Sequence, residues 1–108
     1  MENLIIVFEK EIQKLIKELM PYKPQKIILF GSTARGDLNE GSDLDIVIIK
    51  DTKKRFLDRI ADVLSFYQGK KGLDVLVYTP DEFEKMKEEG NPFIRQVLSE
   101  GKVIYEQQ

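Results

Sequence analysis

Positions 30–49 carry the sequence FGSTARGDLNEGSDLDIVII, in which a Gly-Ser pair ends one apolar run and two aspartates open the next. The connection between the runs is rich in glycine, asparagine and aspartate, which favour turns. Short apolar runs bounded by such residues are typical of buried strands. The segment therefore predicts a strand, a turn-rich connection and a second strand.

Asp43 and Asp45 stand at the head of the second run, and alternate positions of a strand project from the same face. Their Cα atoms would lie roughly 6.5 to 7 Å apart, which suits two carboxylates that converge on metal. Unpaired neighbouring carboxylates repel and are costly to desolvate, so the pair indicates a bound cation. Oxygen ligands favour Mg²⁺ or Mn²⁺, and Mg²⁺ usually binds substrate phosphates as well.

Gly31 and Ser32 supply the complementary half of a phosphate site. A glycine directly after the apolar residues 26–30 permits a tight turn and lets a ligand approach the backbone closely. The first amides of a following helix carry partial positive charge, and the Ser32 hydroxyl adds a donor. Arg35 lies about one helical turn further on, where its guanidinium could reach the same phosphates.

Each of these residues also has a structural interpretation. Ser32 could act only as a helix N-cap, and Arg35 could be an exposed surface cation. Asp43 could complete a turn while Asp45 stays solvated at a strand edge. The combination at this spacing, rather than any single residue, favours nucleotide and metal binding.

The Gly31-Ser32 pair, ten further residues and Asp43-Leu44-Asp45 together resemble the signature of the DNA polymerase beta-like nucleotidyltransferase superfamily. The short chain, with GSTARGD at 31–37 and GSDLDI at 41–46, is similar to its minimal nucleotidyltransferase family, the antitoxin partners of HEPN-domain toxins. The resemblance is strong over residues 26–78 and looser in the flanks. It implies an α/β (α+β) nucleotidyltransferase fold, a small mixed β-sheet with flanking helices.

A third aspartate, Asp74, opens the apolar run of residues 73–78. If this strand neighbours the one that begins near Asp43, three carboxylates meet at one end of the sheet. The resemblance implies that Asp74 binds the catalytic metal and helps to deprotonate the attacking hydroxyl; the alternative is an aspartate that merely follows the turn at Lys71-Gly72. The expected catalytic and metal-binding residues are thus Asp43, Asp45 and Asp74, and the expected nucleotide-binding residues are Gly31, Ser32 and Arg35.

The resemblance implies Mg²⁺-dependent transfer of AMP from ATP to a hydroxyl, with tyrosine of a HEPN toxin as the expected acceptor. Two Mg²⁺ ions are expected, and Mn²⁺ should be able to substitute. Without the resemblance, the residues indicate only metal and nucleotide binding and do not identify the acceptor. Two alternatives stay open: a non-catalytic nucleotide-binding antitoxin that neutralises its partner by binding, and an antibiotic-type enzyme that modifies a small molecule.

Composition bounds these interpretations. A chain of 108 residues, 42% of them hydrophobic, is expected to form one domain over 1–108 with a real core. The chain has no cysteine and no histidine, which excludes disulfides, thiol nucleophiles, Ser-His catalysis and imidazole ligation. A net charge of −2 argues against direct nucleic-acid binding, and the cluster Lys53–Arg55 is expected to be solvated. Because no apolar run approaches the roughly 20 residues that span a bilayer, a cytoplasmic protein without membrane contact is expected.

Helical periodicity predicts a first amphipathic helix from about Asn3 to Met20. Ile5, Ile6 and Val7 make its beginning apolar around most of its circumference, which indicates either a packed end or a surface for a partner. Homo- or hetero-oligomers are compatible with this pattern. Further helices are expected over residues 53–68, 80–89 and 93–100, and strands over 26–30, 43–49, 73–78 and 102–105.

Overall fold

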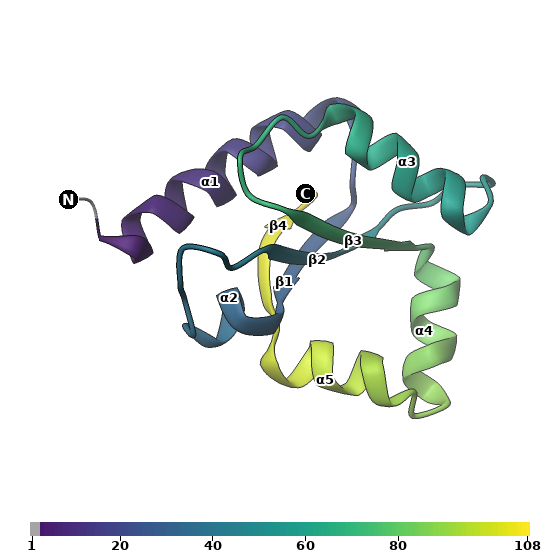
Figure 1. The fold of residues 1–108 in the computed structure, drawn as a ribbon. Helices are drawn as coiled ribbons and strands as arrows, with labels where there is room; N and C mark the ends of the chain where they lie inside the picture. Colours follow the sequence, from purple (N-terminus) through teal and green to yellow (C-terminus); the bar gives the residue numbers. More distant parts are fainter. Residues whose placement is uncertain (1–2) are drawn as a thin grey trace.

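The computed structural model describes residues 3–108, in which a four-stranded sheet carries helices on both faces (Figure 1). Each helix and strand predicted above is present, with ends that shift by at most three residues. The elements in chain order are α1 (Leu4–Leu19), η1 (Met20–Tyr22), β1 (Lys26–Phe30), α2 (Gly31–Arg35), β2 (Leu44–Ile49), α3 (Phe56–Phe66), β3 (Leu73–Tyr78), α4 (Pro80–Glu88), α5 (Pro92–Glu100) and β4 (Lys102–Glu106).

The sheet has the order β3-β2-β1-β4. Strand β2 runs antiparallel to β1 and parallel to β3, and β4 runs antiparallel to β1. This confirms the small mixed sheet expected from the sequence. The short helix α2 and the loop after it lie at one end of the sheet, where β1 ends and β2 begins (Figure 1).

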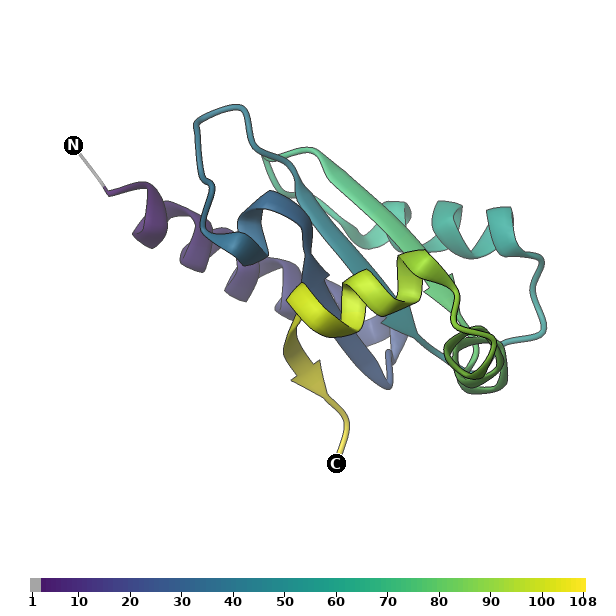
Figure 2. The same ribbon diagram turned by 90° about the horizontal axis from the view of Figure 1, so that it is seen from below.

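Two apolar clusters hold the layers together. Helices α1 and α3 cover one face, where Phe8, Leu15 and Val63 pack on alternate strand residues that include Ile46 and Ile48. Helices α4 and α5 lie on the opposite face, in front of the sheet in Figure 2. On that face Val97 packs with Ile28, Val47 and Ile49, and the ring of Phe93 meets Phe30 edge to face at 5.4 Å.

The alternation along β2 decides which way its polar end faces. Leu44, Ile46 and Ile48 belong to the cluster beneath α1 and α3, whereas Val47 and Ile49 belong to the cluster beneath α5. Asp45 shares its face with the second set, as the sequence predicted. The carboxylates at the start of β2 therefore face the side of the sheet that carries α4 and α5.

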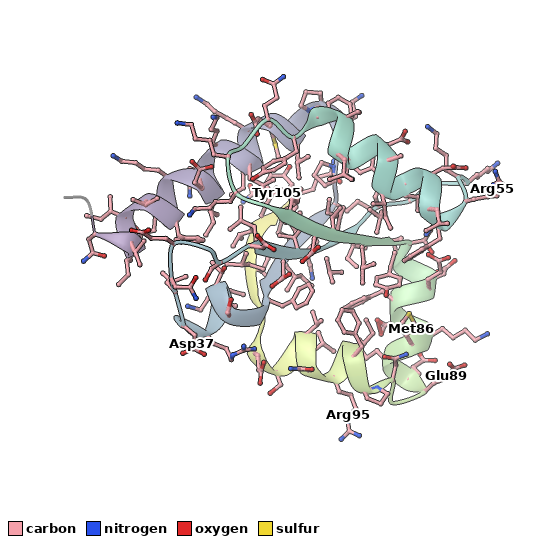
Figure 3. The ribbon with its side chains drawn as sticks, in the orientation of Figure 1. Asp37, Arg55, Met86, Glu89, Arg95 and Tyr105 are labelled. Carbon is pink, nitrogen blue, oxygen red and sulfur yellow. The ribbon has the colours of Figure 1, made fainter. Side chains whose placement is uncertain are left out.

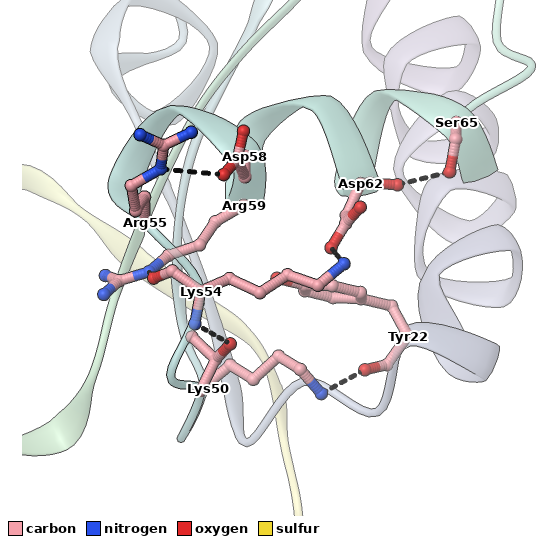
Figure 4. Close-up of polar contacts among 9 residues, drawn as sticks. Tyr22, Lys50, Lys54, Arg55, Asp58, Arg59, Asp62 and Ser65 are labelled. Carbon is pink, nitrogen blue, oxygen red and sulfur yellow. Dashed lines mark hydrogen bonds and ion pairs between the residues drawn. The ribbon is translucent and has the colours of Figure 1, made fainter.

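Helix α3 begins three residues later than predicted. The Lys54 amide donates to Thr52 Oγ1 at 3.2 Å, which closes a turn, and Arg55 keeps an extended backbone as the N-cap residue. The helix ends at Phe66 because Tyr67 is extended, with its hydroxyl donating to the Lys71 carbonyl at 2.6 Å. Charged contacts such as Lys54–Asp62 run along the helix (Figure 4).

Helices α3 and α4 are joined through the buried Arg59. Its guanidinium donates to Glu82 Oε1 at 2.7 Å and to the Val77 carbonyl at 3.1 Å. Glu82 also completes a capping box with Thr79 at the start of α4, as its sequence predicted. Within residues 3–108, none of the helices is long and apolar enough to cross a bilayer.

Candidate active site

Strand pairing brings two of the three candidate carboxylates side by side. Asp45 is the direct partner of Asp74 in the parallel register of β2 and β3. In the antiparallel register of β1 and β2, it lies opposite Phe30, the last residue before Gly31. The expectation that the strands of Asp45 and Asp74 are neighbours is therefore confirmed.

The surroundings of Asp45 leave its negative charge uncompensated. The pKa of this carboxyl is raised from 3.8 to about 6, first by burial and then by a hydrogen bond with Asp74 and by the charges of Asp74 and Asp43. The positive charge of Arg35 acts in the opposite direction but is the weakest of these influences. The start of β2 is therefore a place where a cation would stabilise the ionised protein.

Gly31 lies directly against the Asp45 carboxylate. Its backbone is left-handed, with φ of +73°, and a Cβ at this position would overlap Asp45 Oδ2 and lie 3.1 Å from Asp45 Cγ. Both the backbone angle and the space therefore require glycine. The sequence predicted that a ligand would approach Gly31 closely; in the structure the Asp45 carboxylate does so. This contact places the beginning of α2, including the partly exposed Ser32, beside Asp45.

Asp43 lies one residue before β2, rather than at its first position as predicted. Its side chain contacts Gly72, where a Cβ would come within 2.8 Å of Asp43 Cγ. The Asp43 carbonyl accepts a hydrogen bond from Thr33 Oγ1 at 2.9 Å. The side chain of Asp43 is exposed, and its backbone is held by the hydrogen bond from Thr33. Asp43 lies on the same face of the sheet as Asp45.

Within residues 3–108, the acidic side chains form no group of three or more that could hold a metal ion as they stand. Asp45 lies beside Asp74 across the β2–β3 pair, whereas Asp43 is turned to Gly72. The chemistry of the trio nevertheless fits a hard divalent cation, because all its donors are carboxylate oxygens and the charge on Asp45 is uncompensated. One ion held by all three would require their side chains to turn toward one another.

Arg35 is placed differently from the simplest expectation. Its guanidinium contacts two carboxylates, with Nε 3.4 Å from Asp37 Oδ2 and Nη1 3.3 Å from Glu100 Oε2. Asp37 lies on the outer side of the loop after α2 (Figure 3). Exposed ion pairs of this kind contribute little free energy, so breaking them to free Arg35 for a phosphate would cost little. The charge of Arg35 nonetheless reaches Asp45.

Two residues at this site were not predicted from the sequence. Thr33 stands between the two motif halves, and its side chain is buried because it turns inward from α2. Gly72 precedes Asp74 by two positions and was interpreted only as part of a turn. Their positions next to the motif residues were the only signal available in the sequence.

The mixed sheet with helices on both faces is the fold expected of a nucleotidyltransferase, and comparison with known proteins agrees. Residues 11–108 match the family Polymerase beta, Nucleotidyltransferase. A "putative protein adenylyltransferase" of Methanocaldococcus jannaschii is 36% identical over 96 residues, which cover 89% of this chain and 93% of the relative. A second so described in that organism is 30% identical over 109 aligned positions, covering 91% of this chain and 74% of the relative. The chain belongs to the polymerase beta nucleotidyltransferase family.

Two solved structures have the same fold. A "putative nucleotidyltransferase" from Sulfolobus solfataricus superposes with a TM-score of 0.64 at 22% identity, covering 99% of this chain and 91% of the other. A toxin-antitoxin crystal structure with AMP-PNP superposes with a TM-score of 0.58 at 23% identity, covering 90% and 74%. At these identities the superpositions establish the fold alone.

Proposed function

We propose that this protein transfers AMP from ATP to a hydroxyl group of a partner protein, in a reaction that depends on Mg²⁺. The observation that carries the proposal is the placement of Asp45 beside Asp74, with Gly31 packed on the Asp45 carboxylate. The relatives described as protein adenylyltransferases support AMP as the transferred group. The toxin-antitoxin neighbour supports a role as an antitoxin.

The partner that we propose is a HEPN toxin, with a tyrosine hydroxyl as the acceptor, and both proteins would act in the cytoplasm. This part of the proposal rests on the resemblance of residues 30–49 to the minimal nucleotidyltransferases. The absence of histidine is compatible with it, because a carboxylate, a lysine, a tyrosine or water can take the proton of the attacking hydroxyl instead.

The three aspartates, Asp43, Asp45 and Asp74, would hold the divalent cations, two Mg²⁺ ions or Mn²⁺ in their place. When bound, these ions neutralise phosphate charge and polarise the α-phosphate. Gly31 and Ser32 would bind the β- and γ-phosphates at the start of α2. Arg35 would exchange its exposed contacts with Asp37 and Glu100 for a phosphate contact.

Asp74 is suited to receive the acceptor hydroxyl. It is exposed, and β3 is an edge strand, so a second protein can approach it from beside the sheet. As the acceptor oxygen forms its bond to the α-phosphorus, the bond to the β-phosphate oxygen breaks and pyrophosphate leaves, while Asp74 takes the hydroxyl proton. The exposed edge would let the partner bring its own hydroxyl to the site.

The substitution Asp45→Asn tests the proposal. The variant, purified HEPN partner, Mg²⁺ and α-labelled ATP are incubated together, and label on the partner is followed. We expect transfer to be lost while partner affinity stays unchanged, because the amide keeps the shape and removes the charge. Asp51→Asn is the matched control, since Asp51 is exposed and follows the other end of β2. Undiminished transfer by Asp45→Asn would contradict the assignment.

A binding-only antitoxin is the second candidate, and the exposed N-terminal turns of α1 favour it. Ile5 is 57% exposed and Ile6 is 48% exposed, which is unusual for adjacent isoleucines outside an interface. The binding-only function is supported if the unsubstituted protein binds the partner tightly but transfers no label with either Mg²⁺ or Mn²⁺.

A further inference from the structure

We propose that Thr33 and Gly72 are positioning residues for Asp43: Thr33 fixes its backbone, and Gly72 leaves the room in which its carboxylate can turn. The inference rests on the proposed function, because the placement of Asp43 matters only where it holds the cation. Neither residue needs to touch nucleotide or metal. Each acts on Asp43 by a contact of its own, one through a hydrogen bond and the other through the space it leaves.

Asp43 requires such support because of its place in the chain. It precedes the first residue of β2, and its side chain is exposed. It follows a connection of several residues, in contrast to Asp45, which sits between β1 and β3 in the sheet. A carboxylate at the end of a loop must be oriented by neighbours if it is to bind a metal without a large ordering cost.

The first support acts on the backbone. Thr33 is 8% exposed, and its Oγ1 donates to the Asp43 carbonyl at 2.9 Å. The amide of the same peptide unit, on Leu44, donates to the Gly72 carbonyl at 2.9 Å. Because a peptide unit is planar, fixing its oxygen to α2 and its N–H to the chain before β3 fixes the plane. The position of the Asp43 Cα relative to α2 and β3 is then set.

The second support acts on the carboxylate. A Cβ at Gly72 would overlap Asp43 Oδ1 and come within 2.8 Å of Cγ. The backbone of Gly72 is not left-handed, so its backbone conformation does not require glycine. The space that the missing side chain leaves for the Asp43 carboxylate is the structural reason for glycine here. Gly72 is also exposed, so an alanine there displaces the end of a flexible side chain rather than the core.

The test compares Thr33→Val, Thr33→Ser and Gly72→Ala by Mn²⁺ binding, measured as water-proton relaxation without nucleotide, and by the Mg²⁺ dependence of AMP transfer. Valine keeps the shape of threonine without the donor, whereas serine keeps the donor. We expect roughly 10-fold weaker Mn²⁺ binding for Thr33→Val and Gly72→Ala, as for other residues that orient metal ligands, and near-normal binding for Thr33→Ser. The Mg²⁺ concentration for half-maximal transfer should rise in parallel.

Thr79→Val controls for stability, because Thr79 caps α4 at the far end of β3 and its loss should weaken the fold without changing Mn²⁺ affinity. Wild-type affinity in Thr33→Val and Gly72→Ala, with transfer intact in the parent, overturns this inference and leaves the proposed function standing. If Thr33→Val does not fold, Gly72→Ala decides alone. A parent protein that binds no Mn²⁺ and transfers no AMP overturns the proposed function itself.

Discussion

At the scale of single residues, the candidate site is built at a cost to the fold. Asp45 is a partly buried carboxyl beside two others, which raises its pKa to about 6 and so makes its ionised form less favourable than that of a free aspartate. Gly31 adopts a left-handed backbone to fit against it. A protein under selection for stability alone would replace both, so their presence together favours a function for this end of the sheet.

Gly31→Ala should abolish AMP transfer, because its Cβ would overlap the Asp45 carboxylate. Gly36→Ala is the matched control, since Gly36 has φ of +84° but a Cβ there would meet no other atom of residues 3–108 within 4 Å. Both variants should lose about 1 to 2 kcal/mol of unfolding free energy, the cost of a left-handed alanine. Urea unfolding and labelled transfer measure the two effects. Equal transfer rates in the two variants would contradict the close packing of Gly31 on Asp45.

At the scale of elements, one buried arginine connects helices that the sheet keeps apart. Arg59 of α3 reaches Glu82 of α4 and the Val77 carbonyl of β3. The hydrogen bond from Arg59 is the main reason that the pKa of Glu82 lies below its usual 4.5. A lowered carboxyl pKa contributes stability above pH 4.5, and that contribution is lost as the pH falls through the lowered value.

Glu82→Gln should therefore destabilise the fold at pH 7 by about 1 kcal/mol, allowing for the solvent exposure of Glu82. Glutamine can still complete the capping box with Thr79, so the loss isolates the charge. The difference from the parent should shrink as the pH falls below 4.5, measured by urea unfolding across pH. Glu84→Gln, which loses only an exposed contact of 3.9 Å with Lys87, should change little. A deficit that persists at low pH would mean that the charge is not its source.

Elements were predictable where the signal is local. Strand alternation correctly assigned Asp45, Val47 and Ile49 to one face, because burial on a sheet imposes a period of two. The late start of α3 was missed because the turn at Thr52 depends on a side-chain hydrogen bond rather than on periodicity. The contact of Arg35 with Glu100 joins residues 65 positions apart, and no local pattern encodes such a pair. The roles assigned to Asp43, Asp74 and Ser32 stay predictions.

At the scale of the whole molecule, the apolar beginning of α1 borders a groove through Ile5. A cavity of about 290 Å³ lies between α1, α2 and β4, lined by Ile5, Phe8, Leu38 and Ile104 among others. Ile5 is exposed at its margin, and Ile6 is exposed beside it in the chain. The sequence predicted either a packed end or a partner surface for this part of α1, and the exposure favours the second.

The double substitution Ile5→Ser and Ile6→Ser should weaken binding to the proposed HEPN partner by roughly 10-fold or more, as loss of an apolar interface anchor does. Isothermal titration measures the affinity. Leu57→Ser on α3 is the control, because Leu57 is 76% exposed on a different helix. Full affinity in the double variant would exclude this end of α1 from the interface.

The most direct measurement is the intact mass of the proposed HEPN partner, purified, after incubation with this protein, ATP and Mg²⁺. We predict that the partner gains whole AMP units on a tyrosine, and that Asp43→Ala, which removes one proposed metal ligand, abolishes the gain. A tight complex with no gain in mass, with each of the four nucleoside triphosphates and with Mn²⁺ as well as Mg²⁺, would contradict AMP transfer to that partner.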